Sequence, residues 1–327
     1  MVIIHSIGSM LFILSLLFGM PSETTAETTE SDSSLKNVDF TTISPTFHGK
    51  LPLPEITVMQ CFVMNESTNE LYVSQVIPSS EPSESYRLSR YTIDGVYLDS
   101  MVLKNGGHGT TFGIENSDTD VYIWSSYDKL DESGNVVGHD LVRFKYVGGN
   151  TLTASSIALT RYDTFTSEHV FPVTEQKNNR IAFRVGTGTS TIEIRNLDDI
   201  KNGINQVLHS ISIPQDLEYF QGMSLDGDDL YWYSGDANSV NHDREITLFD
   251  LKTKAIKKRM RVSFGKGASG EYEKEFSEPE GIYLYTDPKT AAKSLFAGIV
   301  TGEKAKRINK LYAYHSMDNR LKFTNNK

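Results

Sequence analysis

The feature that most constrains the fold of this 327-residue chain is a pattern that recurs five times. Each copy reads as a short apolar strand, a polar turn and a second strand of alternating hydrophobic residues, which is typical of antiparallel sheet. The copies begin at Met59, Thr110, His169, Gln221 and Glu280. Self-similarity at a spacing of about 40 to 60 residues is typical of radially repeated β-sheets. We therefore predict an all-β fold, a five-bladed β-propeller with four-stranded antiparallel blades.

Further strands complete each predicted blade. Third strands begin at Tyr86, Asp140, Thr191, Glu245 and Asn309. Outer strands are predicted for the first four blades at 95–103, 150–159, 206–214 and 256–264. The fifth unit has no long outer strand of its own. We expect 37–44 near the N-terminus, or 320–323 near the C-terminus, to supply it, because closing the ring hides exposed strand edges.

The start of the chain reads as a leader. An uncharged apolar run from Met10 to Met20 is followed by small and polar residues that end at Ala26. This run is too short to span a bilayer comfortably and is typical of a signal peptide. We predict a signal peptide over 1–26, a disordered linker over 27–37 and a propeller over 38–327, in a secreted or cell-wall-associated protein without a stable membrane span.

Charge and cysteine content exclude several classes of function. A formal net charge of -10 at pH 7 argues against nucleic acid as a partner, because such binders need clustered positive charge. Cys61 is the only cysteine, so the chain can form no intramolecular disulfide and no cysteine-based zinc site. The apolar neighbours of Cys61 predict a buried, unreactive thiol.

Polar residues open the five repeats, and the first strand of a propeller blade lines the central channel. The predicted channel-lining or ligand residues are Gln60, His108, Thr110, His169, Gln221 and Glu280. One interpretation is that they bond backbone groups and trapped water and so seal the channel. The other is a catalytic pocket or a bound cation, as in propeller lactone hydrolases. Only one of the openers is acidic, so we expect no metal and no cofactor.

His108 lies in the stretch Gly-Gly-His-Gly, where glycines permit positive φ and a tight turn. We expect its imidazole to fix the geometry between blades, so that His108→Ala costs about 1 to 3 kcal/mol. No metalloprotease, nucleophile-elbow, phosphate-loop or dinucleotide motif accompanies it, and we assign no catalytic residue. Trp124 and Trp232 occupy equivalent second strands. They are predicted to pack the blades first and to act as sugar-stacking platforms second.

Three stretches carry a resemblance to a known family: "GGHGTTFGIE…DVYIWSSYD", "QGMSLDGDDLYWYSGD" and "EPEGIYLY". They resemble the β-propeller shared by receptor-binding proteins of staphylococcal phages and teichoic acid biosynthesis protein C of bacilli. Helveticin J-like class III bacteriocins look like more distant members. The similarity covers roughly residues 38 to 327.

The resemblance implies a five-bladed propeller and recognition of cell-wall glycopolymers. We expect a secreted, non-enzymatic binder of a Gram-positive surface glycopolymer such as wall teichoic acid. Two alternatives stay open: a helveticin J-like bacteriocin acting on neighbouring Gram-positive cells, and a propeller hydrolase of lactones or phosphodiesters. Fold alone does not choose among them.

Overall fold

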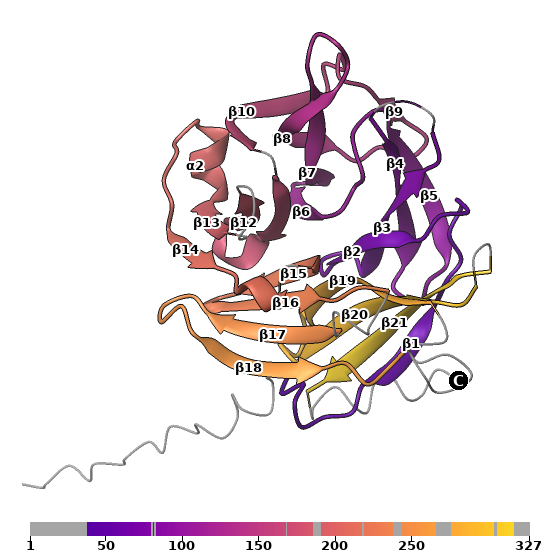
Figure 1. The fold of residues 1–327 in the computed structure, drawn as a ribbon, viewed down its shortest axis with the longest axis vertical. Helices are drawn as coiled ribbons and strands as arrows, with labels where there is room; N and C mark the ends of the chain where they lie inside the picture. Colours follow the sequence, from indigo (N-terminus) through magenta and orange to yellow (C-terminus); the bar gives the residue numbers. More distant parts are fainter. Residues whose placement is uncertain are drawn as a thin grey trace, which may run out of the picture.

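Five antiparallel sheets surround a common axis in the computed structural model, as Figure 1 shows. The structure describes residues 38–79, 81, 83–167, 169–185, 191–217, 219–237, 244–265, 276–303 and 306–316. The predicted signal peptide, the predicted linker and the possible closing strand at 320–323 lie outside these ranges. The prediction of a five-bladed all-β propeller with four-stranded blades is confirmed.

Each blade is built from the axis outward, and the four positions are filled as follows. The first strands are β2 (Met59–Asn65), β6 (Phe112–Ser117), β11 (Phe171–Glu175), β15 (Phe220–Asp226) and β19 (Ser277–Thr286). The second strands are β3 (Glu70–Ile77), β7 (Asp120–Leu130), β12 (Arg180–Val185), β16 (Asp229–Ser234) and β20 (Lys293–Thr301). The third strands are β4 (Ser85–Thr92), β8 (Val136–Lys145), β13 (Thr191–Asn196), β17 (Glu245–Asp250) and β21 (Ile308–His315). The outer strands are β5 (Tyr97–Leu103), β10 (Leu159–Ser167), β14 (His209–Ser212), β18 (Ile256–Arg261) and β1 (Thr46–Leu51).

The ring is closed by the N-terminal part of the described chain, but not by the segment expected. β1 pairs antiparallel with β21 and completes the fifth blade, whereas the predicted closing strand was 37–44 or 320–323. The prediction for 37–44 is wrong because the side chains in this segment are used for packing. Phe40 is fully buried and contacts Tyr231 and Tyr314 edge-on, with ring centroids 6.2 and 6.4 Å away. The segment therefore fills the core between blades 4 and 5, and the closing strand begins after it.

The outer edge of blade 2 also differs from the prediction. Residues 150–159 were expected to form its outer strand, but only β9 (Thr151–Leu152) is extended, and it pairs parallel with β5 of blade 1. The following turn interrupts the strand, because Ser156 Oγ accepts a hydrogen bond from Thr153 N at 2.9 Å. β10 then supplies the outer strand of blade 2 by pairing with β8.

The centre of the propeller is filled by apolar side chains. Phe62, Phe112, Val173, Met223 and Ile282, one from each first strand, line a central cavity of about 10 Å³. This volume is about that of a single water probe, so these side chains leave little free space at this level of the axis.

The two ends of the axis are different. All first strands begin at one face, which we call the mouth face, and turn into the second strands at the other, the turn face. On the turn face, polar contacts join every blade to the next, and so form a closed circle. The pairs are Asn65 with Asn116, Gln176 with Asn116 N, Glu175 with Gly227 N, Asp226 with Lys293, and Glu66 with Thr286 N.

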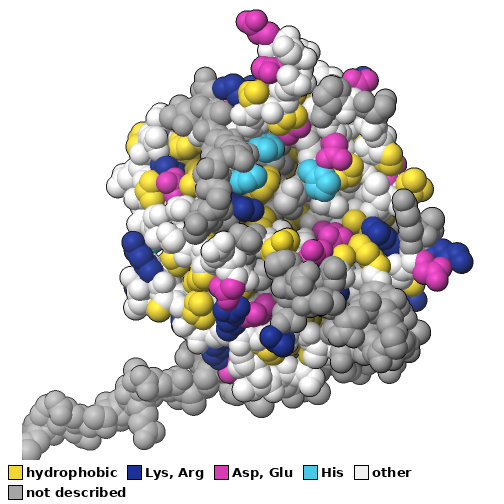
Figure 2. Space-filling model, in the orientation of Figure 1, with side chains coloured by type: hydrophobic (Ala, Val, Ile, Leu, Met, Phe, Trp, Pro, Cys, Tyr) yellow, Lys and Arg dark blue, Asp and Glu magenta, His cyan; other side chains and the backbone are white. Residues whose placement is uncertain are grey.

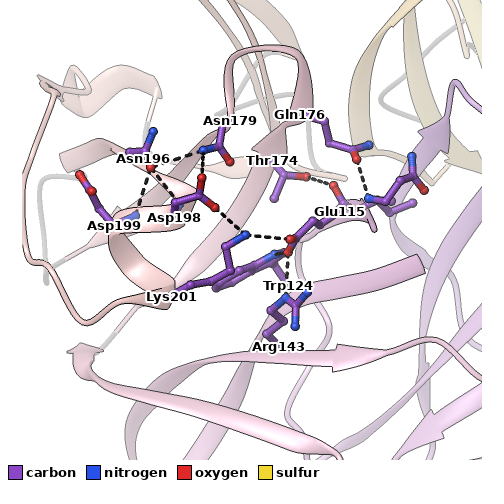
Figure 3. A network of polar contacts seen from close by, with 12 residues as sticks. Glu115, Trp124, Arg143, Thr174, Gln176, Asn179, Asn196, Asp198, Asp199 and Lys201 are labelled. Atoms are coloured by element: carbon purple, nitrogen blue, oxygen red, sulfur yellow. Dashed lines mark hydrogen bonds and ion pairs between the residues drawn. The ribbon is translucent and has the colours of Figure 1, made fainter. Parts of the chain in front are cut away.

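One of these joints is reinforced by a short helix, α2 (Leu197–Lys201), as Figure 3 shows. Glu115 of blade 2 accepts hydrogen bonds from Trp124 Nε1 and Arg143 Nε, both at 2.8 Å. Its second oxygen lies 3.0 Å from Nζ of Lys201, which belongs to blade 3. Asn196 caps the helix by accepting hydrogen bonds from the first-turn backbone. The polar side chains of the turn face thus stabilise the contacts between adjacent blades.

Candidate ligand-binding site at the mouth face

The residues predicted to line the channel lie near the start of the first strands, at the mouth face. Gln60, Gln221 and Glu280 are within β2, β15 and β19, while Thr110 and His169 come two residues before β6 and β11. Glu280 is buried, and the other four are partly exposed. These five residues lie around the axis at the mouth face. Deeper along the axis the space is taken by apolar side chains.

Three of these residues stand at irregularities of the same kind. The pairing register of β2, β15 and β19 with its second strand shifts at Met59/Cys61, Phe220/Gly222 and Pro279/Ile282, where Gln60, Gln221 and Glu280 lie. Such bulges redirect a side chain and increase the local twist. Gln221 Nε2 uses this orientation to donate to Gly235 O at 2.9 Å. The carboxyl of Glu280 is instead enclosed, and burial together with the Glu278 carboxylate raises its pKa well above the ordinary value.

The Gly-Gly-His-Gly stretch is explained by its neighbours. Gly107 has a φ of +95°, and an ideal Cβ placed on it would lie 2.3 Å from Asp128 Oδ1. Gly109 has a φ of +70°, and its Cβ would lie 2.8 Å from the Tyr86 ring. Both positions therefore require glycine, for space and for conformation. Between them, the His108 side chain points outward and is half exposed.

Two histidines at the mouth face lie close to carboxylates. His108 Nδ1 lies 2.5 Å from Glu84 Oε2, and His139 Nε2 lies 3.3 Å from Asp128 Oδ1. The other Asp128 oxygen accepts a hydrogen bond from Ser83 at 2.8 Å. We call Glu84, His108, Asp128, His139 and Glu278 the mouth cluster. Figure 2 shows histidine and acidic side chains gathered around the middle of this face.

Burial and like charge perturb two carboxyls of the mouth cluster. Burial raises the pKa of Asp128, although the Ser83 hydrogen bond and His139 act in the opposite direction. Burial and then the Asp236 carboxylate raise the pKa of Glu278, while Arg307 and His108 oppose the shift. Carboxyls held in this way can exchange hydrogen bonds with a polar ligand at lower desolvation cost than fully hydrated ones.

A row of stacked rings continues from the mouth cluster toward blades 3 and 4. His169 stacks on Phe171 at 5.3 Å and on His139 at 6.3 Å, and Phe171 stacks on Phe220 at 6.0 Å. Trp124 and Trp232, in contrast, are fully buried. Their indole N–H groups donate to Glu115 and to Leu217 O within the protein. Both indoles pack within the blades. The rings of the row, in contrast, are partly exposed at the mouth face.

Four members of the mouth cluster were not among the predicted site residues: Glu84, Asp128, His139 and Glu278. Asp128 and His139 come from the end of a second strand and the start of a third, and both of these positions reach the mouth face in every blade. The repeat pattern could therefore have been used to predict Asp128 and His139 at the mouth face. Glu84 lies in a loop without periodicity, and only its contact with His108 marks it.

The described ranges contain no group of three or more His, Cys, Asp or Glu side chains arranged to hold a metal ion. Within the same ranges, none of the helices has the length and apolar character needed to cross a membrane.

A closed five-bladed propeller with a polar mouth defines the class of protein, and comparisons with known proteins define the family. Residues 58–313 match the phage five-bladed β-propeller receptor-binding platform domain. The chain is 41% identical to a protein of Bacillus subtilis (strain 168) named putative major teichoic acid biosynthesis protein C, over 86% of this chain and 64% of the relative. The chain belongs to this family of receptor-binding platform propellers.

The same similarity is seen among solved structures. The tail fiber of Staphylococcus aureus phage P68 superposes with a TM-score of 0.75 at 27% identity, over 90% of this chain and 57% of the tail fiber. The chain thus spans less than two thirds of the length of both relatives. The family resemblance expected from the sequence is confirmed.

Proposed function

We propose that this protein is an exported, non-enzymatic binder of a Gram-positive cell-surface glycopolymer such as wall teichoic acid, and that it binds through its mouth face. The observation that carries the proposal is membership in a family of phage receptor-binding propellers, together with 41% identity to a protein named for teichoic acid biosynthesis. The family model supports a receptor-binding role, and the name of the Bacillus relative supports the link to teichoic acid, a surface polymer of Gram-positive cells.

The geometry of the mouth face supports binding of a hydroxyl-rich ligand. Glu84, Asp128 and Glu278 offer carboxylate oxygens that accept hydrogen bonds, and the imidazoles of His108 and His139 can donate or accept. The partly exposed rings of Phe171 and Phe220 provide apolar faces beside them. Convergent polar groups next to aromatic faces suit a sugar or polyol, which has hydroxyl groups and apolar C–H surfaces.

Co-sedimentation with purified cell walls tests the proposal. The protein should be retained on walls that carry teichoic acid and released when the acid is extracted. Mouth variants His108→Ala and Glu278→Gln should bind less, while Lys289→Ala on the turn face should bind like wild type. Equal retention on intact and extracted walls would contradict the proposal. N-terminal sequencing of protein from the culture medium tests export, and hydrolysis assays on intact walls test the absence of an enzymatic activity.

A further inference from the structure

A groove beside the mouth cluster, between blades 1 and 2, differs from the rest of the mouth face in its charge. Its volume is about 690 Å³, within the usual range for small-ligand sites. The connection from β5 to β6, the end of β7 and the loop after β9 form its walls. The Gly-Gly-His-Gly stretch leads directly from Asn105 in this groove to His108 at the mouth, so the groove and the mouth cluster are continuous along the chain.

Two lysines on the walls of the groove have no acidic partner. Lys104 and Lys129 both line the groove and are exposed, and no carboxylate of the described part of the chain forms an ion pair with either. Two carboxylates also line the groove. Asp140 is already paired with Arg161 at 2.8 Å, and Asp128, a member of the mouth cluster, contacts His139 and accepts a hydrogen bond from Ser83. The protein has a net charge of -10, so two uncompensated ammonium groups in one groove create a local site for an anion.

The floor of the groove is formed by side chains in contact with one another, and it contains an acceptor without a donor. The Arg161 guanidinium lies over the Tyr127 ring at 4.6 Å, and Tyr127 donates its hydroxyl hydrogen to Lys104 O at 2.5 Å. Asn105 has a φ of +54°, and its buried Oδ1 accepts no hydrogen bond within the described ranges. A buried acceptor without a donor costs free energy, and rotation of the half-buried Asn105 amide toward the groove would let a ligand hydroxyl satisfy it.

We infer that this groove is a subsite for the backbone of an anionic polyol-phosphate chain, in which Lys104 and Lys129 bind a phosphodiester and Asn105 accepts a hydrogen bond from a polyol hydroxyl. The inference rests on the proposed function and assigns the phosphate backbone to the groove. The part of the mouth cluster outside the groove carries Glu84 and Glu278, whose carboxylates repel phosphate, and is left for the sugar or for the neutral part of the polymer. Ammonium groups bind phosphate oxygens by charge-assisted hydrogen bonds, which weaken as salt concentration rises.

The test is calorimetric titration of the full chain with purified poly(glycerol phosphate) and poly(ribitol phosphate), and with glycerol 3-phosphate as a monomeric probe. The double variant Lys104→Ala/Lys129→Ala should bind the polymers about 10-fold more weakly and with a smaller dependence on salt. The double variant Lys252→Ala/Lys289→Ala removes the same charge from the turn face, and it should bind like wild type. Asn105→Gly keeps the positive φ but removes the acceptor, and it should weaken polymer binding several-fold without lowering the unfolding temperature.

The outcomes separate the groove from the proposed function. If wild type sediments with teichoic acid-bearing walls but does not bind the purified polyol phosphates, the groove assignment is wrong and the proposed function stands. Equal loss of affinity in the two double variants would show only an effect of net charge and would also overturn the assignment. Retention on extracted walls, with intact polyol-phosphate binding in solution, would overturn the proposed function and support the groove. Binding of glycerol 3-phosphate as tight as that of the polymers would place a free phosphate ester, and not a chain, in the groove.

Discussion

The carboxylate of Asp128 occupies the space where a side chain on Gly107 would stand: an ideal Cβ on Gly107 would lie 2.3 Å from Asp128 Oδ1. The two residues belong to different parts of blade 2, the connection before β6 and the end of β7. The same carboxylate contacts His139 and Ser83, which lies before blade 1's third strand. The close contact between Gly107 and the Asp128 carboxylate therefore fixes the path of the chain between the groove and the mouth cluster.

Gly107→Ala should destabilise the protein by about 2 to 4 kcal/mol, because the new Cβ meets both an unfavourable φ and the Asp128 carboxylate. Gly134→Ala is a matched control: its φ is +83°, but nothing lies within 4 Å of its Cβ. This variant should cost only about 1 to 2 kcal/mol, which is the cost of placing alanine at a positive φ without a steric clash. Urea unfolding of both variants measures the difference, and equal losses would show that Asp128 gives way at no cost.

His108→Ala should lower the free energy of unfolding by only about 1 kcal/mol or less, since the His108 and Glu84 side chains are 50% and 47% exposed. This is below the 1 to 3 kcal/mol expected from the sequence, where the imidazole was predicted to fix the geometry between blades. Glu84→Gln, which removes the other partner, should have a similarly small effect. Thermal unfolding checks both variants. A loss of about 3 kcal/mol on replacing His108 would restore its role in fixing the blades.

Glu66 should make stability depend on pH in the neutral range. Burial raises its pKa from 4.5 to about 7, so the folded protein binds a proton that the unfolded chain has lost. The contribution of Glu66 is therefore complete below about pH 4.5 and is lost as pH rises through 7. Glu66→Gln can still accept the hydrogen bond from Thr286 N, which Glu66 Oε1 accepts at 2.8 Å.

The variant and wild type should be equally stable at pH 4, and the variant should be more stable by about 2 to 3 kcal/mol at pH 8. Urea unfolding of both proteins from pH 4 to 8 measures this difference. The contributions of the other buried carboxyls are the same in both proteins and therefore cancel. A constant difference across the range would show that Glu66 titrates normally.

The joint between blades 2 and 3 should depend on Glu115 far more than on Lys201. Burial alone would raise the pKa of Glu115, but hydrogen bonds from Arg143, Trp124 and Lys201 outweigh it and lower the pKa. Glu115→Gln should cost about 2 to 4 kcal/mol at pH 7, because it leaves Arg143 without its charged partner. Lys201→Met should cost about 1 kcal/mol or less, since Lys201 is 31% exposed.

The advantage of wild type over Glu115→Gln should disappear in acid, as pH falls through the lowered pKa. Unfolding at pH 7 and pH 3 measures it. Equal costs for the Glu115 and Lys201 variants at pH 7 would mean that the cross-blade ion pair, and not the buried hydrogen bonds within blade 2, stabilises the joint.

The sequence by itself determined the blade count, the order of strands in the blades and the family. Alternation of hydrophobic residues reports local extended structure, and turn residues report where a strand ends, so the first three strands of each blade are encoded within its own repeat. Burial of Cys61, Trp124 and Trp232 follows from the same pattern, because each stands among apolar residues on a packed strand.

Tertiary structure alone decided which segment closes the ring and which side chains meet at the mouth. The sequence predicted 37–44 as a closing strand, but Phe40 fills the space between blades 4 and 5, and 46–51 forms the closing strand β1 instead. Likewise, His108 meets Glu84, and Asp128 meets Gly107, across connections whose lengths follow no period. A side chain's partner depends on how distant segments pack, and that information is spread over the whole chain.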